Sequence, residues 1–156
     1  MSEYGQKAKE LFLEGYNCTQ AVVLAFGDVI QKNESIDTKT LLKMASPFGG
    51  GMGRLREVCG SISGIFMVLG VLEGYHAPED RQGKIDLYRD VQQLAGEFQR
   101  KNGSILCREL LGLEPGKSQP VPEERTRAYY ESRPCPEKIA DAAEILENFL
   151  RSRGML

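Results

Sequence analysis

The residues of this chain with the clearest chemical potential are its four cysteines, Cys18, Cys59, Cys107 and Cys135. They lie far apart in the sequence, and none belongs to the CxxC pair that marks many zinc sites and thioredoxin-like sites. Thiolates can still act together once folding brings them close. They can bind a metal or an iron–sulfur cluster, or two of them can cycle between dithiol and disulfide. All four are therefore candidate catalytic and metal-ligating residues.

Each cysteine is predicted to lie near the amino end of a helix. The expected features are the caps Asn17 and Ser104 before Cys18 and Cys107, the glycine-rich turn before Cys59, and Pro136 directly after Cys135. At such positions the partial positive charge of free backbone N–H groups lowers the pKa of a thiol. Nearby arginines would act in the same direction if they face the sulfur atoms; these are Arg54, Arg56, Arg108 and Arg133. The alternative is that the cysteines are buried as small hydrophobic residues and are inert.

Length and composition point to one globular domain spanning residues 1–156. Hydrophobic residues make up 41% of the chain, charged residues make up 27%, and the net charge is −2. This balance gives no electrostatic reason to expect nucleic acid or an acidic membrane as partner. The first residues contain no apolar signal segment, so we expect a cytoplasmic protein whose cysteines are not a permanent disulfide framework.

The stretch from Pro47 to Gly74 is predicted to organise the fold. A glycine-rich turn leads into a run without charge from Val58 to Leu72, which is typical of a buried helix. Gly60 and Gly64 share one helix face, where a second helix can pack closely, and the pair Gly70 and Gly74 repeats the spacing. This face could also serve a homodimer, although packing within one chain is the preferred interpretation.

The rest of the sequence predicts further helices and no strand. The expected helices cover about 3–14, 17–30, 37–45, 78–102, a short segment after Ser104, and a last helix from Pro136. Residues 112–123 are rich in proline and glycine and predict an irregular loop. Together these features predict an all-α bundle of about seven or eight helices around the glycine-containing central helix.

Three segments together resemble one known family. Asn17-Cys18, the turn Phe48-Gly49-Gly50-Gly51-Met52-Gly53, and Cys59-Gly60-Ser61-Ile62-Ser63-Gly64 are similar to the C_GCAxxG_C_C family, small proteins described as redox-active, with four cysteines and a CGAxxG motif. The resemblance covers nearly the whole chain and implies redox or cluster chemistry at the four cysteines. Ser61 stands where the motif has alanine, and its hydroxyl could form a hydrogen bond near Cys59.

Two classes of function follow. The first is an oxidoreductase or electron carrier with an unidentified redox partner, in which the cysteines hold an iron–sulfur cluster or zinc, or form a dithiol couple. In this case Gly49, Gly50, Gly51 and Gly53 are candidate cofactor-contacting residues, because their N–H groups could cover the sulfur of Cys59. The second class is a helical interaction module with inert cysteines. The turn lacks the P-loop pattern, so nucleotide binding has little support.

Overall fold

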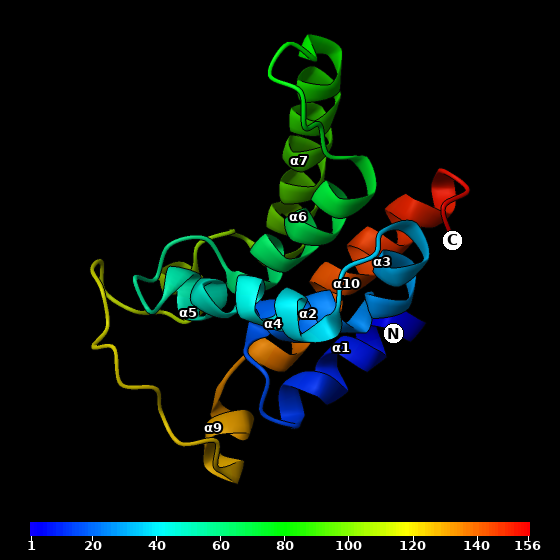
Figure 1. Ribbon diagram of the computed structural model, residues 1–156. Coiled ribbons are helices and arrows are strands. Elements are labelled where there is room, and N and C mark those ends of the chain that lie inside the picture. Colours follow the sequence, from blue (N-terminus) through cyan, green and yellow to red (C-terminus); the bar gives the residue numbers. More distant parts are fainter.

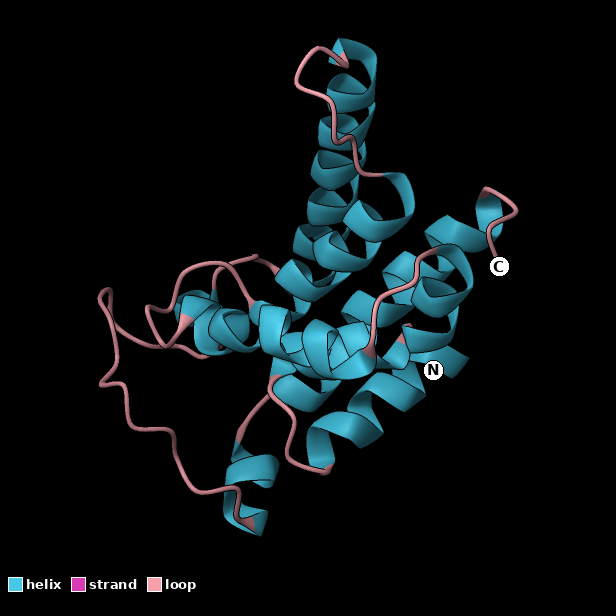
Figure 2. Cartoon of the chain, viewed as in Figure 1, coloured by secondary structure: helices cyan, strands magenta, loops and turns pink.

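The computed structural model describes residues 1–156, and the prediction of an all-α fold without strands is confirmed (Figures 1 and 2). The elements are α1 (Glu3–Leu13), α2 (Cys18–Ala25), α3 (Gly27–Asn33), α4 (Thr38–Ala45), the 3-10 helix η1 (Ser46–Phe48), α5 (Gly49–Met52), α6 (Gly60–Glu73), α7 (Arg81–Asn102), α8 (Cys107–Leu110), α9 (Arg127–Ser132) and α10 (Cys135–Ser152). The helices outnumber the prediction partly because two short helices, α5 and α9, were not predicted. In addition, the helix expected over 17–30 divides at Phe26, whose φ of −93° and ψ of 16° are not helical.

The core forms where α1 packs along α10 and α2 packs along α6. The predicted buried central helix is α6, in which Ile62, Ile65, Val68 and Leu69 are fully buried. Burying one such side chain contributes roughly 1.5–3 kcal/mol, so α6 supplies a large share of the apolar stabilisation. No helix combines the length and the apolar character needed to cross a membrane.

The caps around α2 and α4 agree with the sequence. The side chain of Asn17 accepts a hydrogen bond from the Gln20 amide at 2.8 Å, and the Gln20 side chain accepts one from the Asn17 amide at 3.2 Å. This reciprocal pair is the capping box that the sequence predicts. Asp37 caps α4 through the amide of Thr40. The α2 cap matters most, because it fixes the position of Cys18.

Two predicted helix starts next to cysteines are displaced. The hydroxyl of Ser104 accepts a hydrogen bond from the Leu106 amide, which makes a turn, and α8 begins only at Cys107. The last helix begins at Cys135 and not at Pro136, which occupies the second helical position. The start predicted at Pro78 is also wrong. The side chain of Asp80 caps α7, which begins at Arg81.

The two glycine pairs of α6 behave differently. Gly60 and Gly64 face α2, and a Cβ atom at Gly64 would lie 2.8 Å from the Cβ atom of Val22. The prediction that this face packs closely against a second helix is confirmed. Gly70 has nothing within 4 Å of a built Cβ atom, and Gly74 is the C-cap of α6, so the second pair forms no such face. A homodimer stays a prediction, and the Gly60–Gly64 face is not available to it because α2 covers that face.

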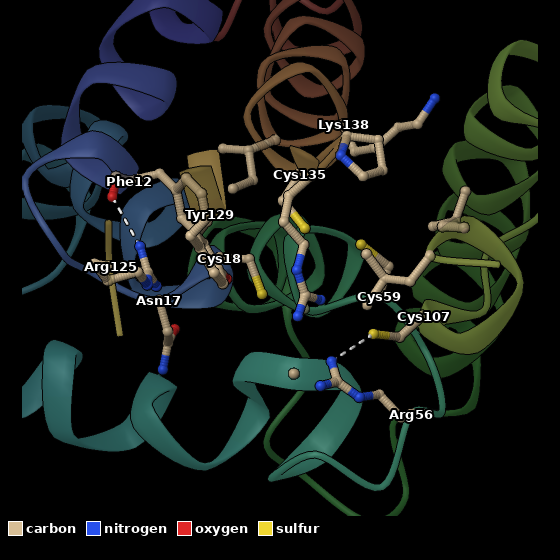
Figure 3. A pocket seen from close by; sticks show the side chains of 17 residues that line it. Phe12, Asn17, Cys18, Arg56, Cys59, Cys107, Arg125, Tyr129, Cys135 and Lys138 are labelled. Atoms are coloured by element: carbon tan, nitrogen blue, oxygen red, sulfur yellow. Dashed lines mark hydrogen bonds between the residues drawn. The ribbon is translucent and has the colours of Figure 1, made fainter. Parts of the chain in front are cut away.

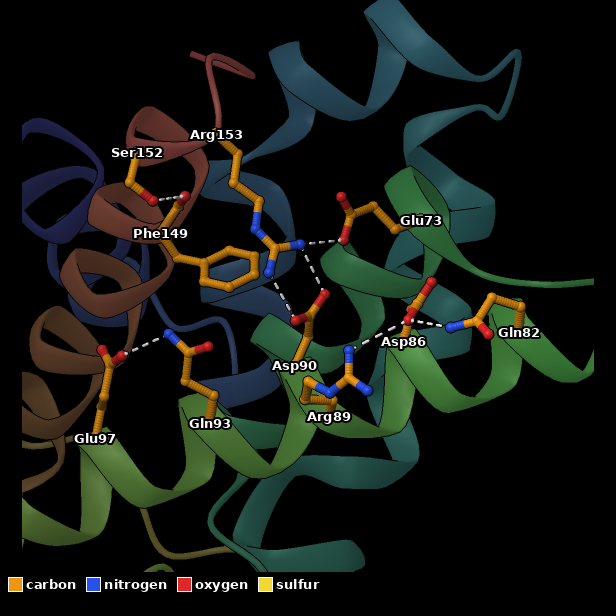
Figure 4. A network of polar contacts seen from close by, with 10 residues as sticks. All are labelled: Glu73, Gln82, Asp86, Arg89, Asp90, Gln93, Glu97, Phe149, Ser152 and Arg153. Atoms are coloured by element: carbon orange, nitrogen blue, oxygen red, sulfur yellow. Dashed lines mark hydrogen bonds and ion pairs between the residues drawn. The ribbon is translucent and has the colours of Figure 1, made fainter.

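The amino-terminal half of α7 projects from the body of the molecule together with the carboxyl-terminal end of α6 (Figure 1). An ion-pair network ties this projection to the end of α10 (Figure 4). Arg153 donates to both carboxylate oxygens of Asp90 at 2.7 and 2.8 Å and to Glu73 at 3.3 Å. Asp90 is only 5% exposed, so the bidentate contact with Arg153 compensates a carboxylate that has lost most of its water.

The predicted irregular stretch 112–123 lies in the loop that links α8 to α9, and this prediction is confirmed. The loop is held against the segment after the glycine turn. The Ser118 amide donates to the Arg54 carbonyl at 2.9 Å, and Arg54 Nε donates to the Gln119 carbonyl at 2.6 Å. These contacts hold the loop against the segment that leads from the glycine turn to Cys59.

Candidate functional site

All four cysteines open onto one cavity of about 80 Å³, which we call the thiol pocket. Figure 3 shows their sulfur atoms directed into the same space, and all four are free thiols. Cys18, Cys107 and Cys135 are the first residues of α2, α8 and α10, and Cys59 is the cap residue of α6. The predicted position of every cysteine at a helix amino end is confirmed.

A short backbone contact places Cys59 beside Cys107. The segments around the two cysteines form an isolated antiparallel β-bridge. Within it the Cys59 amide donates to the carbonyl of Ile105 at 2.8 Å, and the Cys107 amide donates to the carbonyl of Glu57 at 2.6 Å. A single bridge leaves no alternating pattern in the sequence, so sequence reasoning missed it.

Two glycines make room for two of the cysteines. A Cβ atom at Gly60 would lie 2.3 Å from the Sγ atom of Cys18, and one at Gly51 would lie 2.6 Å from the Cβ atom of Cys107. Gly51 also has a φ of 67°, which side chains rarely adopt. Gly60 is the glycine that follows the cysteine of the CGAxxG-like motif. The motif glycine therefore lets Cys18 approach α6.

The glycine turn reaches a different cysteine from the one predicted. The backbone of Gly50 acts to lower the pKa of the Cys18 thiol, although burial raises it by more. Gly50 lines the thiol pocket, Gly49 lines a cavity beside it, and Gly51 and Gly53 line neither. The part of the turn that meets the site therefore acts on the sulfur of Cys18, at the start of α2, and not on that of Cys59.

Ser61 supplies the polar contact to Cys59. Its Oγ atom lies 3.0 Å from the Cys59 Sγ atom, within hydrogen-bond distance. The predicted hydrogen bond between this hydroxyl and the environment of Cys59 is therefore present, and either group can donate it. The residue that departs from the family motif is thus part of the environment of the sulfur.

The expectation that helix amino ends lower the pKa values of the thiols is wrong for three cysteines. Burial raises the pKa of Cys59 to about 12 and that of Cys135 to about 11, and it also raises the pKa of Cys18. Desolvation disfavours the charged thiolate, and here it outweighs the hydrogen bonds and nearby cations that act in the other direction. Without a ligand, these three thiols are neutral at pH 7.

The four arginines predicted to act on the cysteines have different partners. Arg56 is 4% exposed and donates to the sulfur of Cys107 at 3.5 Å, not to Cys59. Arg133 lines the thiol pocket, and its charge acts to lower the pKa of Cys135, against the larger effect of burial. Arg108 instead forms an ion pair with an exposed glutamate, and Arg54 donates to a loop carbonyl. The sequence therefore identified two of the four cations that line the pocket.

Arg125 and Lys138 are the pocket cations that sequence reasoning missed. The guanidinium of Arg125 lies 4.3 Å from the ring centre of Phe12 and 5.1 Å from that of Tyr129. Lys138 is on the first turns of α10 and donates to the side chain of Asn102 at 2.7 Å. No aspartate or glutamate lines the pocket. The thiols therefore lie in a cationic environment.

The raised thiol pKa values predict alkaline instability of the reduced, metal-free protein. Above the ordinary thiol pKa of 9.0 the unfolded chain releases protons that the folded protein keeps, until the pH passes about 12 for Cys59. Stability therefore falls as pH rises through this window, by about 1.4 kcal/mol per pH unit for each such thiol. Denaturant unfolding between pH 8 and 11 should show a shallower fall for Cys59→Ala than for the wild-type protein. Equal slopes in the two proteins would contradict the burial of this thiol.

The fold and the pocket define an all-α protein whose candidate site is built from four free thiols in a cationic environment. The comparisons agree: the family model described as "Putative redox-active protein (C_GCAxxG_C_C)" matches residues 16–149, which include all four cysteines. The chain belongs to this family. Comparisons with curated proteins and with solved structures gave no match.

Proposed function

We propose that the four cysteines together bind an iron–sulfur cluster and that the protein carries electrons. The observation that carries this proposal is the convergence of four thiols from four helix starts on one cavity without a carboxylate in its lining. Four cysteine thiolates are the usual ligands of [2Fe–2S] and [4Fe–4S] clusters, and an all-sulfur donor set selects soft metals. Such a cluster, when bound, supplies one-electron transfer.

The charges around the pocket support this proposal. A cluster held by four thiolates carries net negative charge, and a cationic environment favours it. Arg56 and Arg125 line the pocket and form no ion pair with a carboxylate. Lys138 donates only to an amide oxygen. These cations would therefore stabilise the negative charge of the thiolates when the cysteines become ligands.

The contacts of the sulfur atoms fit the same purpose. Cys59 lies beside the Ser61 hydroxyl, Cys107 receives a hydrogen bond from Arg56, and the backbone of Gly50 acts to lower the pKa of Cys18. Hydrogen bonds to ligand sulfurs tune the reduction potential of a cluster and fix the orientation of its ligands. The glycines that admit Cys18 and Cys107 leave the space into which these side chains turn.

A single zinc ion fits the pocket less well. Four sulfurs at the Zn–S distance of about 2.3 Å in a tetrahedron lie about 3.8 Å from one another. No three histidine, cysteine or acidic side chains in the chain are grouped so that they could hold one metal ion. In a polynuclear cluster different sulfurs bind different iron ions, so the ligands can stand further apart.

The second candidate is a dithiol–disulfide couple, and the Arg56–Cys107 contact is the observation that favours it. Arg56 donates to the Cys107 sulfur at 3.5 Å, so Cys107 is the candidate nucleophile that attacks a disulfide of a partner protein. The resulting mixed disulfide is resolved by a second thiol of the pocket, so the partner gains two electrons while this chain forms a disulfide. The raised pKa values of Cys18, Cys59 and Cys135 oppose fast attack by these thiols.

Anaerobic purification followed by absorption spectroscopy and iron, sulfide and zinc analysis tests the proposal. We expect a brown protein with iron and sulfide in matching amounts, and a colourless protein when all four cysteines are replaced by serine. A colourless, metal-free wild-type protein that still takes up no iron and sulfide on reconstitution would reject the cluster. Reversible loss of two thiols on oxidation would then favour the dithiol couple. If the four-serine variant keeps the redox behaviour, the cysteines are inert and the interaction-module hypothesis gains.

A further inference from the structure

A second cavity of about 200 Å³ lies beside the thiol pocket, and we call it the outer pocket. Its walls are the glycine turn, the loop before α9, and four arginines, namely Arg54, Arg56, Arg125 and Arg133. The last three of these arginines also line the thiol pocket. The outer pocket is therefore a cationic space that adjoins the cysteines.

The positive charge of the outer pocket is mostly uncompensated. Glu123 is the only acidic residue in its lining, and it forms an ion pair with Arg133. The other three arginines form no ion pair. Arg54 donates to a loop carbonyl, and Arg56 donates to a serine hydroxyl and a thiol. Arg125 donates to the carbonyls of Phe12 and Tyr16 and to the hydroxyl of Tyr130. All of these acceptors are uncharged.

Burial makes this charge costly. Arg56 is 4% exposed, and a cation removed from water is costly unless an anion lies near it. Its hydrogen bonds at 2.9 Å to Ser118 Oγ and at 3.5 Å to Cys107 Sγ satisfy donors but do not neutralise the charge. An anion in the outer pocket would neutralise it.

The arginines are also held in place before any ligand arrives. Arg125 donates to the Phe12 carbonyl at 3.1 Å and to the Tyr16 carbonyl at 3.2 Å, and its guanidinium lies over the Phe12 ring. Arg54 is held by its hydrogen bond to the Gln119 carbonyl. Guanidinium groups fixed in this way bind carboxylates and phosphates through paired N–H donors with little loss of entropy.

We propose that the outer pocket binds a small oxyanion, that is, inorganic phosphate or sulfate or the carboxylate or phosphate group of a small molecule. Arg54, Arg56 and Arg125 are the binding residues. The ligand would lie next to the redox site, in the position of a substrate or of a regulatory anion. This inference rests on the cavity and its charges. Arg54 lines the outer pocket and not the thiol pocket, so its charge stays available to an oxyanion when Arg56 and Arg125 face a cluster.

Isothermal titration calorimetry of the full-length, reduced and metal-free protein tests the inference. The probes are inorganic phosphate, sulfate and acetate, with chloride keeping the ionic strength constant. We expect saturable binding of at least one probe, and weakening by at least about tenfold in Arg54→Gln, because a hydrogen bond to a charged group is lost. Tighter phosphate or sulfate binding would identify a tetrahedral oxyanion, and tighter acetate binding would identify a carboxylate.

Arg127→Gln is the matched control, because Arg127 is 92% exposed and pairs with Glu131. It should bind the probes like the wild-type protein. Arg125→Gln is a second test variant, and circular dichroism verifies that each variant is folded. Absence of saturable binding to the folded wild-type protein would overturn the proposal. So would equal weakening in Arg54→Gln and Arg127→Gln, which would indicate a general charge effect.

Discussion

Gly60→Ala is expected to destabilise the protein by about 2–3 kcal/mol, the size typical of overpacking a tight site. The new Cβ atom would lie 2.3 Å from the Cys18 Sγ atom, 2.7 Å from the Thr19 Oγ1 atom and 3.0 Å from the carbonyl oxygen of Phe48. The Thr19 hydroxyl cannot move away freely, because it donates to the Gly60 carbonyl at 2.8 Å in the buried interface. Urea unfolding measures the loss, and iron uptake on anaerobic reconstitution should fall because Cys18 is displaced.

Gly70→Ala is the matched control for this prediction, since it places the same methyl group on the same helix. Nothing lies within 4 Å of a Cβ atom at Gly70. Alanine also has a helix propensity that is about 1 kcal/mol better than that of glycine, so this variant should be slightly more stable than the wild-type protein. Similar destabilisation by both variants would contradict the idea that Gly60 is required for close approach.

Replacing any one of the four cysteines by serine is expected to reduce the affinity for iron by at least about tenfold. Loss of a residue that only supports a metal ligand already costs about that much, and here a ligand itself is lost. The reason is that all four thiols line the same cavity, and its lining offers no histidine or carboxylate as a substitute ligand. Iron and acid-labile sulfide per chain, measured after reconstitution under limiting iron, give the comparison. The largest loss is expected for Cys107, the most buried of the four.

Ser61→Ala provides the control for the cysteine series. It removes a hydroxyl 3.0 Å from the Cys59 sulfur but leaves the sulfur in place. Iron content should therefore stay near the wild-type value, while the reduction potential shifts because a hydrogen bond to the sulfur is lost. If two of the four serine variants keep full iron content, those cysteines are not ligands and the four-cysteine site is wrong.

The parts of the structure that could be predicted are those set by local sequence. The start of α2 is determined by the capping box, which needs only the neighbouring residues Asn17 and Gln20. The uncharged run after Cys59 has only one favourable place, the interior, so its burial as α6 follows from composition. The positions of the cysteines at helix amino ends are local in the same sense, and they were predicted correctly.

The parts that could not be predicted depend on contacts between distant segments. The thiol pKa values rise because the thiols are buried together, and no single helix end contains that information. Arg56 is near Cys59 in sequence, but the backward turn of the chain and the β-bridge bring it to Cys107. Arg125 reaches the pocket from a loop whose path has no sequence signature.

X-ray absorption at the iron edge of the anaerobically reconstituted protein tests the central claim most directly. We predict a first coordination shell made only of sulfur and a second shell that contains iron, as in a polynuclear cluster on cysteine thiolates. The four-serine variant, treated in the same way, should lose both shells. A first shell of oxygen or nitrogen around isolated iron in the wild-type protein, equal to that of the variant, would show that the four cysteines are not cluster ligands.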